Sequence, residues 1–322
     1  MPTRLLETLE AKTAEAFLDY LTPHRKSPLW QRSDEASWIF RGVRSAEWAL
    51  QPSAFRMGED GNPAFTKFKP GQLRELPYRT VREQLAHEEG AVLDFAGRVS
   101  DAGFEVPGDR PELRTSEMSK LLPHPFDGRD FPPLHFRWFY ALAQHYGVPT
   151  RFLDWTASAL VAAYFAAEAA ARRIKGGKAQ AGEKLAVWAL SGEFVRRVAS
   201  RWSPGPVIIT VPTHSNPNLR AQSGLFTLVR YAMRTDRKKV LRQPPTLDEL
   251  FAAQRRSARL PLGLPRGVPF LHKFALPVSE SPALLHYLHR SGIDRARLFP
   301  GLHSVVQAML EESITSRRSP QS

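Results

Sequence analysis

The segment from Gln144 to Thr156 carries the densest set of reactive side chains in this sequence. It reads Gln-His-Tyr-Gly-Val-Pro-Thr-Arg-Phe-Leu-Asp-Trp-Thr, which places an imidazole, a phenol, a guanidinium and a carboxylate around one glycine and one proline. A loop that only connects two elements seldom needs so many different donors and acceptors beside rigid turn residues. We therefore interpret this segment as a candidate site.

Four side chains of the segment suggest chemical roles by their type. His145 could carry a proton or orient a ribose hydroxyl, because imidazole titrates near neutral pH. Asp154 could accept a hydrogen bond from an arginine, a histidine or a sugar. Tyr146 could stack on a ring, and Arg151 could hold a phosphate, because a guanidinium presents parallel donors to phosphate oxygens.

The end of the segment leads into a predicted helix. Thr156 is expected to cap that helix, and a helix N-terminus favours a bound anion such as phosphate. The alternative is a structural role, in which Asp154 pairs with Arg41 or Arg151 in the interior and Trp155 fills the core.

A second candidate lies earlier in the chain, where Phe40-Arg41-Gly42 ends a predicted strand. The Arg41 guanidinium could hold a phosphate or pyrophosphate, and Gly42 could let a ligand approach the backbone. The alternative is that Arg41 pairs with an internal carboxylate and ties two layers together.

Two weaker candidates come from a helix and from the lead-in to a strand. Glu88 could supply a carboxylate, although a charged residue on a helix is more often on a solvated face. Arg220 and Gln222 would share one face if their segment is extended, and could bind a nucleotide or an amide. In the alternative, Gln222 only satisfies buried backbone groups.

Composition limits the classes of protein and partner. The 322 residues include 45 Lys and Arg against 32 Asp and Glu, a net charge of +13, which favours nucleic acid, phosphorylated molecules or acidic proteins as partners. A basic face for nucleic acid would form from these residues: Arg230, Arg234, Arg237, Lys238, Lys239, Arg242, Arg255, Arg256, Arg259 and Arg266. A solvated surface without a specific partner is the competing account.

Several common classes are not indicated by any motif. The chain lacks a phosphate loop, a dinucleotide glycine fingerprint, a His-Glu-x-x-His zinc motif and acidic pairs spaced for two metals, so we expect no metal site. With no cysteine there can be no disulfide, which fits a reducing compartment. Neither a signal peptide nor a membrane span is evident, so we expect a cytoplasmic protein without membrane contact.

Hydrophobic periodicity predicts the elements that must position these groups. Helices are expected at these ranges: 4–21, 81–99, 134–146, 157–173, 247–256, 282–291 and 302–312. Strands are expected at 38–42, 185–190, 207–211, 225–229 and 270–276. Since helices come mainly first and strands mainly later, we predict an α+β fold with a mixed or antiparallel sheet and an N-terminal helical subregion.

The motifs together resemble the FRG domain family, which takes its name from the Phe-Arg-Gly tripeptide. Matching segments include Phe40-Arg41-Gly42, Trp48 to Ser53, Gln144 to Thr156, Asn218 to Phe226 and Leu298 to Leu302. The resemblance implies a bacterial intracellular protein, often linked to phage defence. We divide the chain into a lead-in at 1–35, an FRG domain at 36–312 and a polar tail at 313–322.

The tripeptide is also similar to the aromatic-Arg-Gly element of ADP-ribosyltransferases, in which the arginine holds the phosphates of NAD. By that resemblance Ser53 and Gln222 are weak matches to a later serine and to the closing glutamine or glutamate. The pattern departs at Gly224, where a glutamate two residues after Gln222 would be needed. The carboxylate would then be Glu88 or Asp154, or absent.

Three functions follow as hypotheses. The first is an effector that binds an NAD-like nucleotide and transfers or hydrolyses ADP-ribose, with a pocket built from Arg41, His145, Tyr146, Arg151, Asp154 and Gln222. The second is a nucleic-acid-binding or nucleic-acid-targeting effector without NAD chemistry. The third is a regulatory protein that senses a nucleotide without turning it over.

Overall fold

A computed structural model describes residues 6–23, 27, 29–30, 37–57, 64, 81–104, 132, 136–199, 205–212, 216–229, 246–256 and 269–315. Their strands form one seven-stranded sheet in the order β1-β7-β4-β2-β3-β6-β5. The strands are β1 (Leu6–Glu10), β2 (Trp38–Val43), β3 (Phe152–Thr156), β4 (Lys184–Ser191), β5 (Pro206–Ile209), β6 (Gly224–Val229) and β7 (Leu271–Pro277). Only β1 and β7 pair in parallel among these neighbours, so the sheet is mixed.

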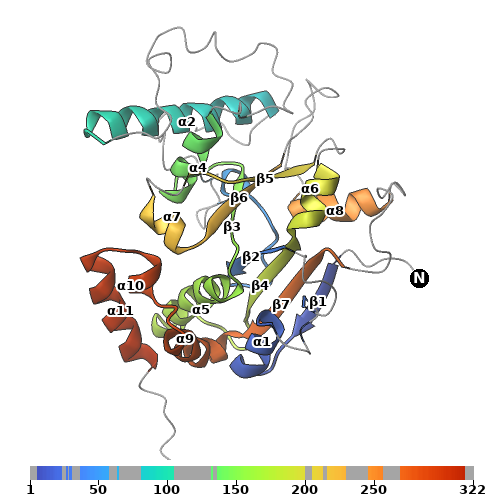
Figure 1. Cartoon of the computed structure of the whole chain (residues 1–322), viewed down its shortest axis with the longest axis vertical. Coiled ribbons are helices and arrows are strands. Elements are labelled where there is room, and N and C mark those ends of the chain that lie inside the picture. Colours follow the sequence, from blue (N-terminus) through green and yellow to red (C-terminus); the bar gives the residue numbers. More distant parts are fainter. Residues whose placement is uncertain are drawn as a thin grey trace, which may run out of the picture.

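Helices cover both faces of the sheet and both of its ends (Figure 1). They are α1 (Ala14–Leu21), α2 (Val81–Asp101), α4 (Arg137–His145), α5 (Ala159–Lys175), α6 (Gly192–Ala199), α7 (Pro217–Ala221), α8 (Leu247–Arg256), α9 (Ser281–Arg290), α10 (Arg295–Leu298) and α11 (Leu302–Thr315). Together with the sheet they confirm the predicted α+β class.

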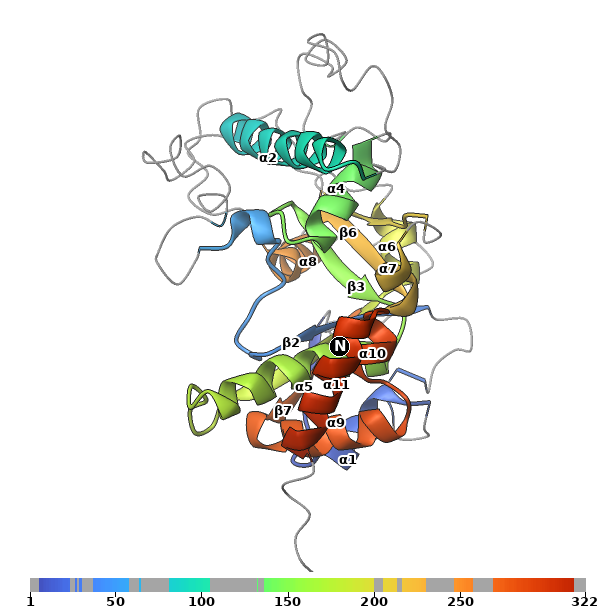
Figure 2. The same ribbon diagram turned by 90° about the vertical axis from the view of Figure 1, so that its left-hand side faces the viewer.

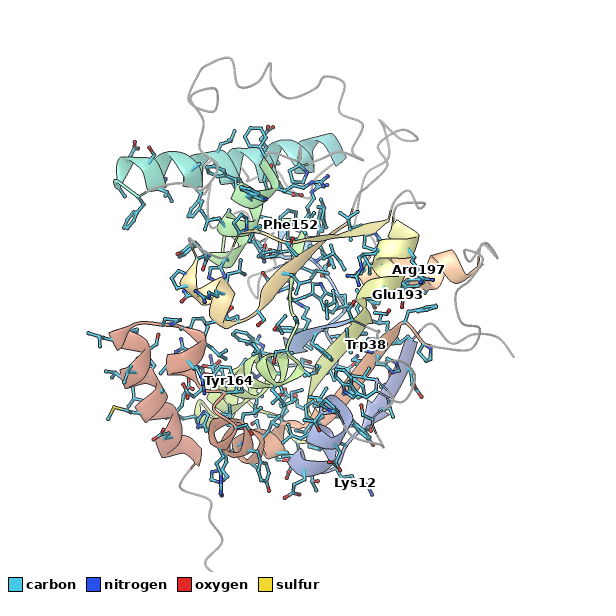
Figure 3. The ribbon with its side chains drawn as sticks, in the orientation of Figure 1. Lys12, Trp38, Phe152, Tyr164, Glu193 and Arg197 are labelled. Carbon is cyan, nitrogen blue, oxygen red and sulfur yellow. The ribbon has the colours of Figure 1, made fainter. Side chains whose placement is uncertain are left out.

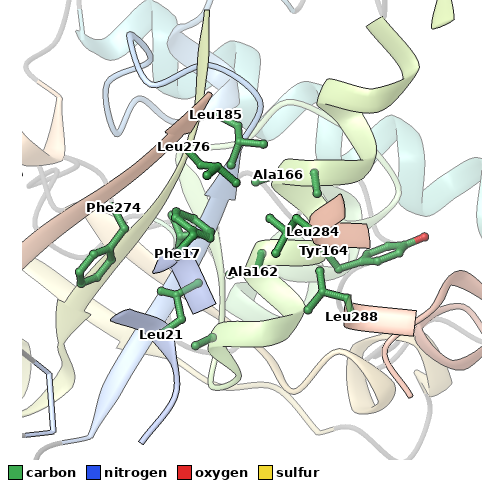
Figure 4. Close-up of a cluster of buried hydrophobic side chains, with 14 of the residues drawn as sticks. Phe17, Leu21, Ala162, Tyr164, Ala166, Leu185, Phe274, Leu276, Leu284 and Leu288 are labelled. Atoms are coloured by element: carbon green, nitrogen blue, oxygen red, sulfur yellow. The ribbon is translucent and has the colours of Figure 1, made fainter. Parts of the chain in front are cut away.

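Helix α5 lies at the centre of the largest core cluster, against one face of the sheet (Figure 4). Its inward positions are mostly alanines, which allow the helix backbone to approach the strands closely. Gly42 on β2 completes this contact, because a Cβ added there would lie 1.9 Å from the carbonyl oxygen of Ala162. Gly42 therefore allows helix α5 to approach strand β2 closely. The expectation that Gly42 makes room for a ligand is corrected.

The sheet is nearly interrupted at its middle. Strands β2 and β4 pair along six residues, whereas β2 and β3 pair only at Phe40 and Thr156. Figure 2 shows β2 and β3 running in different directions. Because backbone groups freed from a ladder need other partners, this divergence opens a place for side chains between the two strands.

Two expected boundaries were wrong, each for a local reason. Residues 4–21 do not form one helix, because β1 pairs with β7 before α1 begins, and Thr13 is the N-cap of α1. Residues 152–156 form strand β3, and α5 begins at Ala159 with Ser158 as its cap. Thr156 instead donates to the carbonyl oxygen of Gln222 at 2.7 Å and accepts from the Ser158 N–H.

Candidate functional site

Arg41 and Asp154 meet where β2 and β3 diverge. The Arg41 Nη1 donates to the backbone oxygen of Asp154 at 2.7 Å and lies 3.4 Å from its Oδ2. The Arg41 guanidinium thus donates to a backbone carbonyl that would otherwise accept from the N–H of a paired strand. Arg41 is 13% exposed and Asp154 is 47% exposed, so the pair is open to solvent on the carboxylate side.

Gln144, at the end of α4, fixes the orientation of this carboxylate. Its Nε2 donates to Asp154 Oδ2 at 3.0 Å, and its Oε1 accepts from the hydroxyls of Ser53 and Thr150 at 2.9 and 2.8 Å. Donors on one side and an acceptor on the other define which way the amide points. Within the described ranges, the side-chain contacts of Asp154 are made by Oδ2, so Oδ1 is the oxygen that a ligand could bind.

Arg56 brings a second guanidinium to the cluster. The pKa of Arg56 is lowered to about 10, mainly by burial and also by the charge of Arg41, while Asp154 acts in the opposite direction. Its Nε donates to the backbone oxygen of Gln51 at 2.9 Å. Arg56 was not predicted from the sequence. The one signal that could have indicated it is its position three residues after the candidate Ser53.

His145 lies beside the cluster at the last position of α4. Burial lowers the pKa of His145, and the Asp154 carboxylate opposes that shift. The imidazole is therefore held neutral at physiological pH, as a proton acceptor requires. Gly147 ends the helix with a φ of 90°, which a glycine adopts without strain, and thereby sets the direction of the chain toward β3.

Tyr146 lies next to His145 but on the surface. The residue is 62% exposed, and its ring stacks on Phe95 of α2, with 6.2 Å between ring centroids. The ring is accessible to a ligand, as the predicted stacking role requires.

Glu88 and Arg151 are brought together away from solvent. Arg151 Nε and Nη2 donate to the two carboxylate oxygens of Glu88 at 2.7 and 2.8 Å, and their side chains are 1% and 0% exposed. This bidentate pair joins α2 to the segment before β3. Its burial favours a structural role over the phosphate-binding and catalytic roles that the sequence suggested.

Arg220 and Gln222 do not share a face. The segment is helix α7 followed by its C-cap, so the extended conformation on which the shared face depended does not form. Arg220 is exposed, whereas Gln222 is buried and donates to the backbone oxygen of Leu298 at 3.1 Å. Gln222 thus follows the alternative in which it satisfies a buried backbone group.

Other expectations concern metals, membranes and the basic face. The described residues contain no group of three or more His, Cys, Asp or Glu side chains placed to hold a metal ion. None of the helices in the described ranges is long and apolar enough to cross a membrane. Of the basic clusters, residues 230–242, 259 and 266 lie outside the described residues, as do the side chains of 255 and 256.

Comparison with known proteins gives one match. No curated protein and no solved structure matches the chain. A family model for the FRG domain matches residues 111–174, which include α4, β3 and all but the last residue of α5. Three of the clustered side chains, from Gln144, His145 and Asp154, therefore fall within the match. The chain carries an FRG domain over residues 111–174.

Proposed function

We propose that the chain binds an NAD-like nucleotide at the cluster of Arg41, Arg56, His145 and Asp154, and hydrolyses or transfers its ADP-ribose. The observation that carries the proposal is the pair of guanidinium groups beside a single carboxylate in a partly buried place. Two like charges repel strongly where water is partly excluded, and a bound anion would relieve that repulsion.

A pyrophosphate suits this arrangement better than a single carboxylate ligand does. It offers several oxygens to two planar donor groups, and guanidinium binds phosphate oxygens in bidentate fashion. The ribose next to it could then donate a hydroxyl to Oδ1 of Asp154. The neighbouring Tyr146 ring supports the proposal as an exposed surface for a base.

The proposed reaction at the cluster is cleavage of NAD between its nicotinamide and the adjoining ribose. The bond between ribose C1′ and the nicotinamide nitrogen breaks, and nicotinamide leaves with the electron pair. Asp154 stabilises the cation that develops on the ribose. Water or an acceptor hydroxyl bonds to C1′, and His145 takes its proton, so that NAD and water give ADP-ribose, nicotinamide and a proton.

The proposal departs from ADP-ribosyltransferases in its carboxylate. Gln222 is held by Leu298 and Glu88 by Arg151, so neither supports the proposed role. Asp154 takes that role because it is exposed and lies against Arg41.

The test is to incubate the protein with NAD and measure free nicotinamide and ADP-ribose adducts by mass spectrometry. Wild type should release nicotinamide, and Arg41→Gln should not. Arg98→Gln is the matched control, because Arg98 is an exposed arginine of α2 that pairs with the exposed Asp94 on the same helix. NAD binding without any product would favour the nucleotide sensor, and neither binding nor product would remove the proposal.

The nucleic-acid effector remains a prediction from the net charge of +13 and from the arginine clusters late in the sequence. Binding to DNA or RNA that weakens steeply with added salt would support it.

A further inference from the structure

Helix α11 carries its large apolar side chains on the side facing away from the molecule. Leu302 is 87% exposed, and the others are Val305 at 45%, Val306 at 55%, Met309 at 65% and Leu310 at 53%. Positions 302, 305, 306 and 309 follow the spacing of one helix face. Figure 2 shows α11 at the front of the view, on the outside of the fold.

The inward side of α11 is instead polar or small. Ala308 and Glu311 are the buried residues of the helix among those with described side chains. Glu311 accepts from the hydroxyl of Tyr164 at 2.7 Å and lies 3.5 Å from Arg295 Nη1. Figure 3 shows Tyr164 on the side of α5 that faces α10 and α11.

These contacts determine which way the helix faces. Turning the apolar side inward would separate the carboxylate of Glu311 from Arg295 and from Tyr164, and would leave the buried Tyr164 hydroxyl without the acceptor that it has in this structure. The apolar face is therefore a stable property of the folded chain, and we call these five residues, Leu302, Val305, Val306, Met309 and Leu310, the α11 face.

We propose that the α11 face is the contact surface between two copies of this chain, with the two α11 helices packed antiparallel about a twofold axis. The proposal is independent of the nucleotide site. The face exposes on the order of 500 Å² of apolar surface, the size of the largest apolar patch on a typical protein, and such patches often mark interaction sites. Two such faces bury at most about 1,000 Å² on pairing, which is the lower limit expected of a biological interface.

A second copy fits the chemistry of the face better than a charged partner does. From residue 302 to residue 310 the helix carries no Asp, Glu, Lys or Arg, so two copies meet without opposed like charges there. A twofold contact needs a surface that complements itself, and a uniform apolar stripe does. An acidic partner would be drawn to the +13 chain as a whole but would find no lysine or arginine on this face.

Sedimentation velocity across a concentration series tests the assembly. Wild type should be a dimer in the micromolar range, and the dimer should tighten severalfold between about 50 and 500 mM salt, because salt screens repulsion between two positively charged copies. Val306→Lys combined with Met309→Lys should be monomeric and should keep the circular-dichroism spectrum of the folded wild type, while its melting temperature loses the dependence on protein concentration that dimerisation gives wild type. Met57→Lys is the matched control, since Met57 is 58% exposed and lies outside the face.

A milder variant protects the test against misfolding. The chain has no cysteine, so Val306→Cys introduces a single thiol. Under oxidising conditions it should form a disulfide-linked dimer in high yield, because residues near the twofold axis approach closely enough to bridge. Met57→Cys should stay mainly monomeric. Wild type that is monomeric at all concentrations, or Val306→Cys that cross-links no better than Met57→Cys, would overturn the proposal.

Discussion

The buried Glu88–Arg151 pair gives a quantitative prediction that separates a structural role from a functional one. Glu88→Gln leaves the Arg151 guanidinium in the interior without its carboxylate, and both original bonds are short, at 2.7 and 2.8 Å. Breaking a buried, hydrogen-bonded ion pair from one side costs about 3–5 kcal/mol. The midpoint of urea unfolding should therefore fall markedly, with NAD binding unchanged in the protein that remains folded.

Two comparisons sharpen this prediction. Replacing both partners, as Glu88→Leu with Arg151→Met, should recover most of the lost stability, because no buried charge is left uncompensated. Asp94→Asn on the same helix breaks an exposed pair with Arg98 and should cost less than about 1 kcal/mol. If Glu88→Gln unfolds like wild type but no longer binds NAD, the carboxylate belongs to the ligand site and the structural assignment is wrong.

Three further predictions concern packing and protonation. Gly42→Ala should destabilise the fold by about 1–3 kcal/mol or more, since its methyl group would meet the Ala162 backbone at 1.9 Å, and an unchanged melting temperature would contradict that contact. Burial raises the pKa of Glu89 from 4.5 to about 7, so the stability that its proton provides is present below pH 4.5 and lost as pH rises through 7. Glu89→Gln should therefore be more stable than wild type at pH 8 but not at pH 4.5, as measured by urea unfolding. Because burial lowers the pKa of His145, nicotinamide release should be constant from pH 7 to 9 and should decrease in acidic buffer, whereas a rate that rises from pH 7 to 9 would exclude this base.

Elements whose apolar residues follow a regular spacing or a continuous run were predictable from the sequence. The continuous apolar runs became β4, β6 and β7, and the alanine-rich run became α5, because burial on several sides leaves few alternatives. β1 was missed because it is an edge strand whose burial merely alternates between half-buried and exposed, so Leu6 and Leu9 matched a helical spacing by chance. β3 was missed because it is short and carries Asp154 at its centre.

The candidate site was predicted in part. Arg41, His145 and Asp154 were expected in one place, and the fold places Asp154 in contact with Arg41 and within electrostatic reach of His145. Gln222 and Arg151 were expected there too, but each is bound elsewhere by a partner that only the tertiary structure supplies. A residue's type indicates what it can bind, whereas its partner depends on contacts between distant segments.

Titration of NAD into the protein by calorimetry tests the central claim most directly. Wild type should bind with heat that saturates at one site per chain, and Arg41→Gln should weaken binding by about 10-fold or more, as expected for the loss of a charged hydrogen-bond donor to phosphate. Arg98→Gln should bind like wild type. The same affinity in wild type and Arg41→Gln, or no heat in either, would show that the guanidinium of Arg41 serves only to join β2 to β3 through Asp154.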